Sequence, residues 1–203
     1  MSVYGPVVTG GDVRQAVQTT IETWIDAYLA EVAAQHGRNR GDLPSFRSIT
    51  SSPRGVNTWP EDQLPACVIV CPGLAKDPRE MGNGDYTGEW SVGVGVVCSG
   101  MDQETTNELV ELYCAAVRGA LLQHQSLGGF ASDTRWVDEM YNELTFDSSR
   151  TLAGGIVNIG VSVDAVLNSH SGLRNPPVDP NVDPGELPQV GTAGVTTQMT
   201  QDQ

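Results

Sequence analysis

The segment from Tyr86 to Cys98 alternates large apolar residues with small ones, and this period of two fixes it as a β-strand. Successive side chains of a strand point to opposite faces. One face must therefore be buried in a core, while the small residues on the other let another backbone or a helix approach closely. The large set is Trp90, Val92, Val94, Val96 and Cys98, and the small set is Ser91, Gly93, Gly95 and Val97.

Three further segments predict strands beside this one. Residues 67–71 form a short, wholly apolar run, which is typical of a buried strand. Residues 134–146 and 151–167 predict an antiparallel hairpin with one solvated face, because a turn-forming Ser-Ser-Arg sequence joins them and the second segment alternates apolar with polar or small residues. Residues 46–49 are a candidate for one more short strand.

Two segments show the three- and four-residue spacing of an amphipathic helix. The first runs from Asp12 to His36, with Asp12 as the expected N-cap and Gly37 as the expected stop. The second runs from about Asp102 to Gln125, again with an aspartate as N-cap. A helix as long as the first must cover a sheet or a neighbouring subunit.

This order of elements predicts an α+β domain over residues 1–167: a two-layer structure with an about four-stranded, mainly antiparallel sheet and two long helices packed on one face. Residues 168–203 form a second region, predicted to be a Pro-rich extended C-terminal arm. They contain no aromatic residue and no hydrophobic period, so alone they bury too little apolar surface to offset their ordering entropy. We therefore expect a partner chain to hold this arm. Its prolines are at 176, 177, 180, 184 and 188.

The four cysteines are interpreted as small buried hydrophobes rather than as a site. Only Cys67 and Cys71 are close in sequence, and four residues along a strand separate them by about 13 Å, too far for one tetrahedral ion. Cys98 and Cys114 lie on a strand and a helix, and a reducing compartment argues against disulfides. The histidines at 36, 124 and 170 show no metal-ligand spacing. We expect no metal and no cofactor.

The charge of the chain excludes one class of function. The 203 residues carry a formal charge of -14, with Lys76 as the only lysine. Such a chain offers no basic surface to a phosphate backbone, so a stand-alone nucleic-acid binder is not expected. No apolar run approaches the roughly 18 residues of a membrane span, and the N-terminal residues lack the apolar core of a secretory signal. The sequence therefore predicts a soluble cytoplasmic protein without membrane contact.

No catalytic pattern stands out in the sequence. It has neither a Gly-rich phosphate-binding loop ending in Lys nor the Gly-x-Ser-x-Gly turn of a nucleophilic serine. The closest acidic group is Asp138, Glu139 and Glu143, but the first two point to opposite faces of a strand. A solvated strand face is the favoured interpretation, with paired acid and base carboxylates as the alternative. We expect that the chain is not an enzyme.

The order and local sequence of these segments resemble one known family. The matching features are a long N-terminal helix, the strand Leu64-Pro65-Ala66-Cys67-Val68-Ile69-Val70 running into Pro72-Gly73, the strand Trp90-Ser91-Val92-Gly93-Val94, a central helix and a closing strand pair. Over about residues 10–167 the chain resembles the tail terminator proteins of long-tailed (siphovirus) bacteriophages, of the type found in phages that infect actinobacteria.

This resemblance implies a structural virion protein that performs no reaction. Tail terminators form a ring, sixfold in that family, which caps the tail tube, ends tail elongation and joins the tail to the head connector. The implied partners are further copies of the chain in a homohexamer, the tail tube protein and the head connector protein. The implied location is the head–tail neck of the virion, with assembly in the host cytoplasm.

The acidity of the chain suits such a ring, since a negative channel would let DNA pass through the lumen without specific binding. The arm beyond Asn168 has one Arg and four acidic residues, a net charge of -3. Of the total of -14, the folded domain therefore carries -11.

Two segments are the expected contacts of the ring. The first is the Gly-rich loop from Leu74 to Asp85, long enough to be a projecting hairpin tip; a solvent loop without a contact is the alternative. The second is the arm, lying across an adjacent subunit or the connector. The candidate interface residues are Lys76, Asp77, Arg79, Glu80, Asn83 and Asp85 in the loop and Arg174, Pro176, Pro177, Pro180 and Pro184 in the arm.

The sequence leaves other functions open. The nearest is a different head–tail component, such as a connector stopper or a tail tube subunit of related fold. Tube subunits stack in many rings, whereas a terminator makes one. A small acidic enzyme using Asp138, Glu139 or Glu143 is more distant, and an unattached regulatory or binding domain, which should stay monomeric, is the third alternative.

Overall fold

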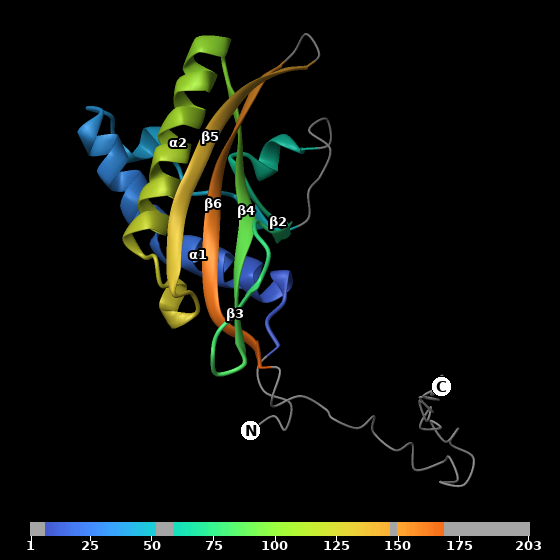
Figure 1. Ribbon diagram of the computed structural model, residues 1–203. Coiled ribbons are helices and arrows are strands. Elements are labelled where there is room, and N and C mark those ends of the chain that lie inside the picture. The colour runs from blue at the N-terminus through green and yellow to red at the C-terminus, as the bar shows by residue number, and fades with distance from the viewer. Residues whose placement is uncertain (1–6, 52–58, 147–149, 169–203) are drawn as a thin grey trace, which may run out of the picture. The chain divides into compact units, whose positions relative to one another are not determined.

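A computed structural model describes residues 7–51, 59–146 and 150–168 (Figure 1). The chain forms two long helices, α1 (Gly10–Gln35) and α2 (Gln103–Gln123), and one sheet in the order β1-β2-β4-β6-β5, with β3 paired to β4. Both helices lie on the same face of the sheet, because their buried side chains share one core with β2, β4 and β6. The strands are β1 (Ser48–Thr50), β2 (Ala66–Leu74), β3 (Arg79–Glu80), β4 (Asp85–Gly100), β5 (Asp133–Phe146) and β6 (Arg150–Asn168).

The α+β class is confirmed, but the sheet differs from the prediction in two respects. It has six strands rather than about four, and it is mixed rather than mainly antiparallel, since β1 runs parallel to β2. β1 has three residues and β3 two, too few to show the alternation that reveals a strand in sequence. Strand direction depends on the connection between strands, which local periodicity does not encode.

The ends of both helices are set by local side-chain chemistry. Thr9, not Asp12, is the N-cap of α1: its side chain accepts from the backbone N–H of Asp12, and the Asp12 carboxylate accepts from the N–H of Thr9 at 2.8 Å. The Thr9 hydroxyl also donates to the Asp12 carboxylate at 2.6 Å, and this bond, together with that from the Thr9 N–H, holds the pKa of Asp12 below its usual range. Gly37 ends α1 with φ at +66°, as predicted. Asp102 caps α2 by accepting from the N–H of Thr105 at 2.8 Å, also as predicted.

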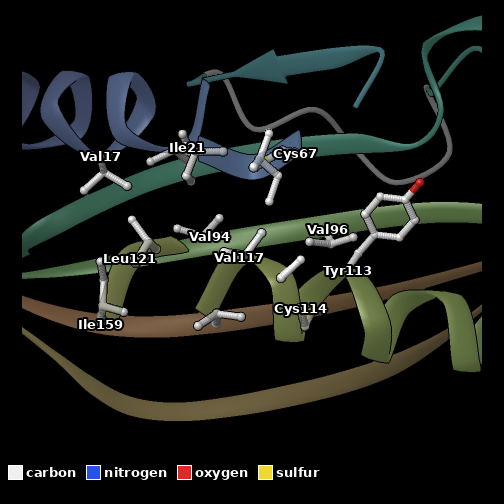
Figure 2. Close-up of a cluster of buried hydrophobic side chains, with 14 of the residues drawn as sticks. Val17, Ile21, Cys67, Val94, Val96, Tyr113, Cys114, Val117, Leu121 and Ile159 are labelled. Carbon is white, nitrogen blue, oxygen red and sulfur yellow. The ribbon is translucent and has the colours of Figure 1, made fainter. Parts of the chain in front are cut away.

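The core lies between the helices and the sheet (Figure 2). Val17 and Ile21 from α1 and Leu121 from α2 point toward Val94 and Ile159 of the sheet, and all five are fully buried or nearly so. Burial of each such side chain contributes about 1.5–3 kcal/mol. The predicted apolar face of β4 is confirmed, because Trp90, Val92, Val94, Val96 and Cys98 are all buried.

The opposite face of the sheet is covered in part by its own chain. Trp59 and Leu64 pack on Val97 of β4 and Leu152 of β6 in a second, smaller cluster. Farther along β4, Gly93 lies beneath the side chains of β2 and β6, since a Cβ there would be 2.9 Å from Cδ1 of Ile156. Side chains of the neighbouring strands therefore fill the space at Gly93; the close approach of another backbone or a helix to this face stays a prediction.

Candidate assembly surface

β5 occupies one end of the sheet order, and among the described strands it pairs only with β6. Its other edge therefore carries backbone N–H and C=O groups without a strand partner in the described part of the chain. At 14 residues, from Asp133 to Phe146, this is a long edge. Folded proteins usually shorten, charge or cover such edges because they template pairing with another chain.

Large apolar side chains gather on the same strand. Each of the four is about half exposed: Trp136 (49%), Val137 (55%), Met140 (51%) and Tyr141 (49%). Apolar side chains at this exposure on a free edge mark an interaction surface when they are contiguous. We call these four residues, together with the free edge of β5, the β5 surface.

A β-bulge shapes this surface. Trp136 lies opposite Ile159 and Asp138 opposite Asn158, so Val137 is the extra residue of the pair. After the bulge, Glu139 and Tyr141 are on the face of β5 that is nearer to α2, opposite Val157 and Gly155. A partner at this edge would meet apolar side chains on both faces of the strand.

An ion pair ties β5 to α2. Arg118 of α2 donates to one carboxylate oxygen of Glu139, and the hydroxyl of Tyr141 donates to the other. The guanidinium also lies over the ring of Trp136, 4.9 Å from its centroid. The Glu139 side chain is only 5% exposed, whereas that of Arg118 is 32% exposed, so the carboxylate is the shielded partner of the pair. Burial, followed by the bond to Glu139, raises the pKa of the Tyr141 hydroxyl. These contacts hold Trp136 and Tyr141 of the β5 surface against α2.

On the opposite face of the sheet, a second charged group crosses three strands. The Glu89 carboxylate of β4 accepts from Lys76, at 2.8 Å, and from Arg135 of β5. The bridge passes over Gly160 of β6, where a Cβ would be 2.9 Å from Glu89 Oε1 and 3.1 Å from Arg135 Nε. The hydrogen bond from Lys76, with the help of Arg135, holds the pKa of Glu89 below its usual range.

The predicted contact loop is an ordered hairpin. Arg79 and Glu80 form β3, opposite Thr87 and Tyr86 of β4, and Asn83 donates to Asp85 at 2.6 Å in the turn. The six loop candidates do not form one cluster: Lys76 joins the Glu89 bridge, while Glu80 accepts from Tyr86 at 3.3 Å. Lys76, Asp77, Arg79, Glu80 and Asn83 are exposed, as a contact requires, and their role stays a prediction.

The arm candidates Arg174, Pro176, Pro177, Pro180 and Pro184 lie outside the described residues. The same holds for His170.

The acidic residues of β5 do not come together at one site. Asp138 accepts from the amide of Asn158 at 2.6 Å, whereas Glu139 points to the other face and pairs with Arg118. The predicted separation of these two carboxylates is therefore confirmed. The interpretation as a solvated face is wrong for Glu139, whose side chain is buried beside α2; sequence periodicity does not show which helix residue lies opposite a strand.

The cysteines behave largely as predicted. All four are free; Cys67, Cys98 and Cys114 are buried, and Cys71 is partly buried. Burial raises the pKa of Cys114 to about 12, so this thiol stays protonated and inert at neutral pH. Within residues 7–51, 59–146 and 150–168, no three or more His, Cys, Asp or Glu side chains are placed to hold a metal ion.

One polar hollow near the core is small. It has a volume of about 240 Å³ and lies beside the hydroxyl of Tyr113, which donates to the backbone carbonyl of Pro44. Its lining includes one cation, Arg47, and two carboxylates, Asp42 and Glu61. This volume falls below the roughly 300 Å³ at which ligand pockets begin. The β5 surface remains the stronger candidate.

No model of a known protein family matches the chain, and no curated protein sequence matches it. None of the helices among the described residues is long and apolar enough to cross a membrane.

Sequence reasoning did not identify the β5 surface. The signal was present, since residues 134–146 mix aromatic and acidic residues in a way that indicates a part-exposed strand. What the sequence did not show is that this strand ends the sheet, because strand order is a property of the whole fold.

Proposed function

We propose that the protein is a structural subunit that self-associates through the β5 surface into a closed ring. The observation that carries this proposal is the long free edge of β5 with four half-exposed apolar side chains along it. A contact between this edge and a different surface of the next copy is heterologous, and heterologous contacts generate closed rings when their rotation closes.

The resemblance to tail terminator proteins supplies the biological role within this proposal. The ring would cap the tail tube of a long-tailed phage, end tail elongation and join the tail to the head connector in the virion neck. Tail tube and connector proteins would be its partners, and the chain would perform no reaction. The net charge of -14 supports a lumen through which DNA passes without specific binding.

The experiment is to determine the mass and shape of the purified full-length chain over a range of concentrations, by native mass spectrometry and electron microscopy. A single closed ring, sixfold if the likeness to terminators holds, is the expected result. Stacked rings of open-ended length would instead favour a tube subunit. A chain that stays monomeric at the highest soluble concentration contradicts self-association through β5.

A further inference from the structure

The β5 edge favours one kind of partner strand. Its exposed positions include Asp133 and Asp138 beside the apolar Val137 and Met140. Two β5 edges paired with each other would place the acidic groups of two copies on one interface, and like charges on neighbouring strands are destabilising. A strand without charge but with apolar side chains on one face would avoid this cost.

The chain itself contains such a segment in its C-terminal arm. Residues 189–201, Gln-Val-Gly-Thr-Ala-Gly-Val-Thr-Thr-Gln-Met-Thr-Gln, include no proline and no charged residue. They follow Pro188 and precede Asp202, so the segment is bounded on both sides. Valine and threonine, which favour strands, are frequent in it. Ala193, Val195 and Met199 fall on positions of the same parity and would share one face of a strand.

The connection is long enough to reach a second subunit. β6 ends at Asn168, six residues beyond Ser162, which lies opposite Asp133 at the start of β5. Residues 169–188 then separate β6 from the uncharged segment. Twenty residues of extended chain span up to about 70 Å, well beyond the width of this sheet. The prolines of this connection disfavour its pairing in a sheet, which leaves residues 189–201 as the part suited to it.

We propose that residues 189–201 of one copy add as a strand to the free edge of β5 in the next copy. Main-chain hydrogen bonds along β5 would provide affinity, and the apolar face of the added strand would cover Val137 and Met140. Each copy then gives one strand and accepts one, which is the heterologous contact a ring needs. This inference rests on the proposed self-association and names the segment that fills its site.

Photo-crosslinking in the full-length chain tests the proposal. A photoreactive amino acid replaces Val137, and an equimolar mixture of ¹⁵N-labelled and unlabelled chains distinguishes links between copies from links within one copy. We expect crosslinks between copies that map to residues 189–203. The matched control has the same group at Met101, which is 99% exposed and lies away from the sheet edges, and it should give no such link.

Substitution of Thr197 by proline provides a second measurement, because it removes a backbone donor from residues 189–201 and changes no residue of the described domain. We expect self-association to weaken at least tenfold. Crosslinks from position 137 to the sheet of a second copy, or to the arm of the same chain, would overturn the strand exchange while leaving ring formation intact. A wild-type chain that neither associates nor crosslinks between copies would overturn both proposals.

Discussion

The two edge strands of the sheet, β1 and β5, differ in how readily they could pair with a strand of another chain. β1, at one end, has three residues, and Ile49 at its centre packs partly against the core. β5, at the other end of the sheet (Figure 1), has 14 residues. It carries four half-exposed apolar side chains. A short edge with an inward-packed side chain is poorly suited to pairing, whereas a long apolar edge invites it. The contrast supports the proposal that β5, rather than β1, is the edge that pairs with another copy.

The largest effect on self-association is expected when charged residues are introduced on the β5 surface. Replacing Val137 and Met140 together by lysine should weaken self-association at least about 100-fold, because two apolar anchors are lost and edge lysines oppose pairing. Both side chains are about half exposed, so the folded monomer should keep its stability. Analytical ultracentrifugation measures the association. Met101→Lys is the control, and an equal loss in that variant would show that the effect is not specific to β5.

The second largest effect is expected when the ion pair that anchors β5 on α2 is removed. Arg118→Ala leaves the buried Glu139 carboxylate without its cation and should destabilise the fold by about 3 kcal/mol. Arg38→Ala removes a more exposed pair with Glu108 and should cost less than about 1 kcal/mol. Urea unfolding compares the two variants. Adding Glu139→Gln to Arg118→Ala should recover part of the loss, and no recovery would point to lost packing instead of lost charge.

A smaller effect is expected from the strand that supports β5. At Gly155 of β6, an added Cβ would be 2.7 Å from Cys114 Sγ and 2.8 Å from Val110 Cγ1, both on α2. Gly155→Ala should therefore cost about 2 kcal/mol through overpacking. At Gly95 of β4 the nearest atom would be 3.6 Å away, so Gly95→Ala should change stability by less than about 0.5 kcal/mol. Thermal unfolding of the two variants gives the difference, and equal stabilities would contradict the close approach of α2 to β6.

The smallest effect concerns the bridge that joins β5 to β4 on the opposite face. The pKa of Glu89 is lowered in the folded state by Lys76 and Arg135, so its ionised form stabilises the fold above the unfolded pKa of about 4.3. That contribution is lost as the pH falls through the folded pKa. Between about pH 5 and pH 3, wild type should lose more stability than Glu89→Gln, by less than about 1 kcal/mol. Urea midpoints measured across this range should differ in slope, and parallel curves would contradict the bridge.

The elements of this fold with a clear period were predictable from the sequence. Both helices, β4 and β6 follow from apolar spacing, whereas β2 follows from a continuous apolar run and β5 from its mixture of aromatic and acidic residues. The buried face of β4 was correctly assigned, from Trp90 to Cys98. β1 and β3 escaped a firm prediction because two or three residues carry no period. The sequence prediction placed the N-cap of α1 at Asp12 instead of Thr9, because both residues take part in the same capping box.

The candidate surface was less accessible to sequence reasoning than the fold. The apolar residues of β5 are visible in sequence, but their exposure depends on β5 ending the sheet. The burial of Glu139 depends on Arg118, which is 21 residues away on a helix whose rotation the strand sequence does not encode. Long-range placement of this kind is decided by packing rather than by local periodicity.

The central claim is that the β5 edge becomes covered when the chain assembles. Hydrogen–deuterium exchange of the full-length protein, measured at low and at high concentration, tests directly whether the backbone of β5 becomes covered. Slower exchange over residues 133–146 at high concentration, with exchange over residues 48–50 unchanged, is the result that the account predicts. Protection confined to other parts of the chain, or exchange of β5 that is the same at both concentrations, would contradict it.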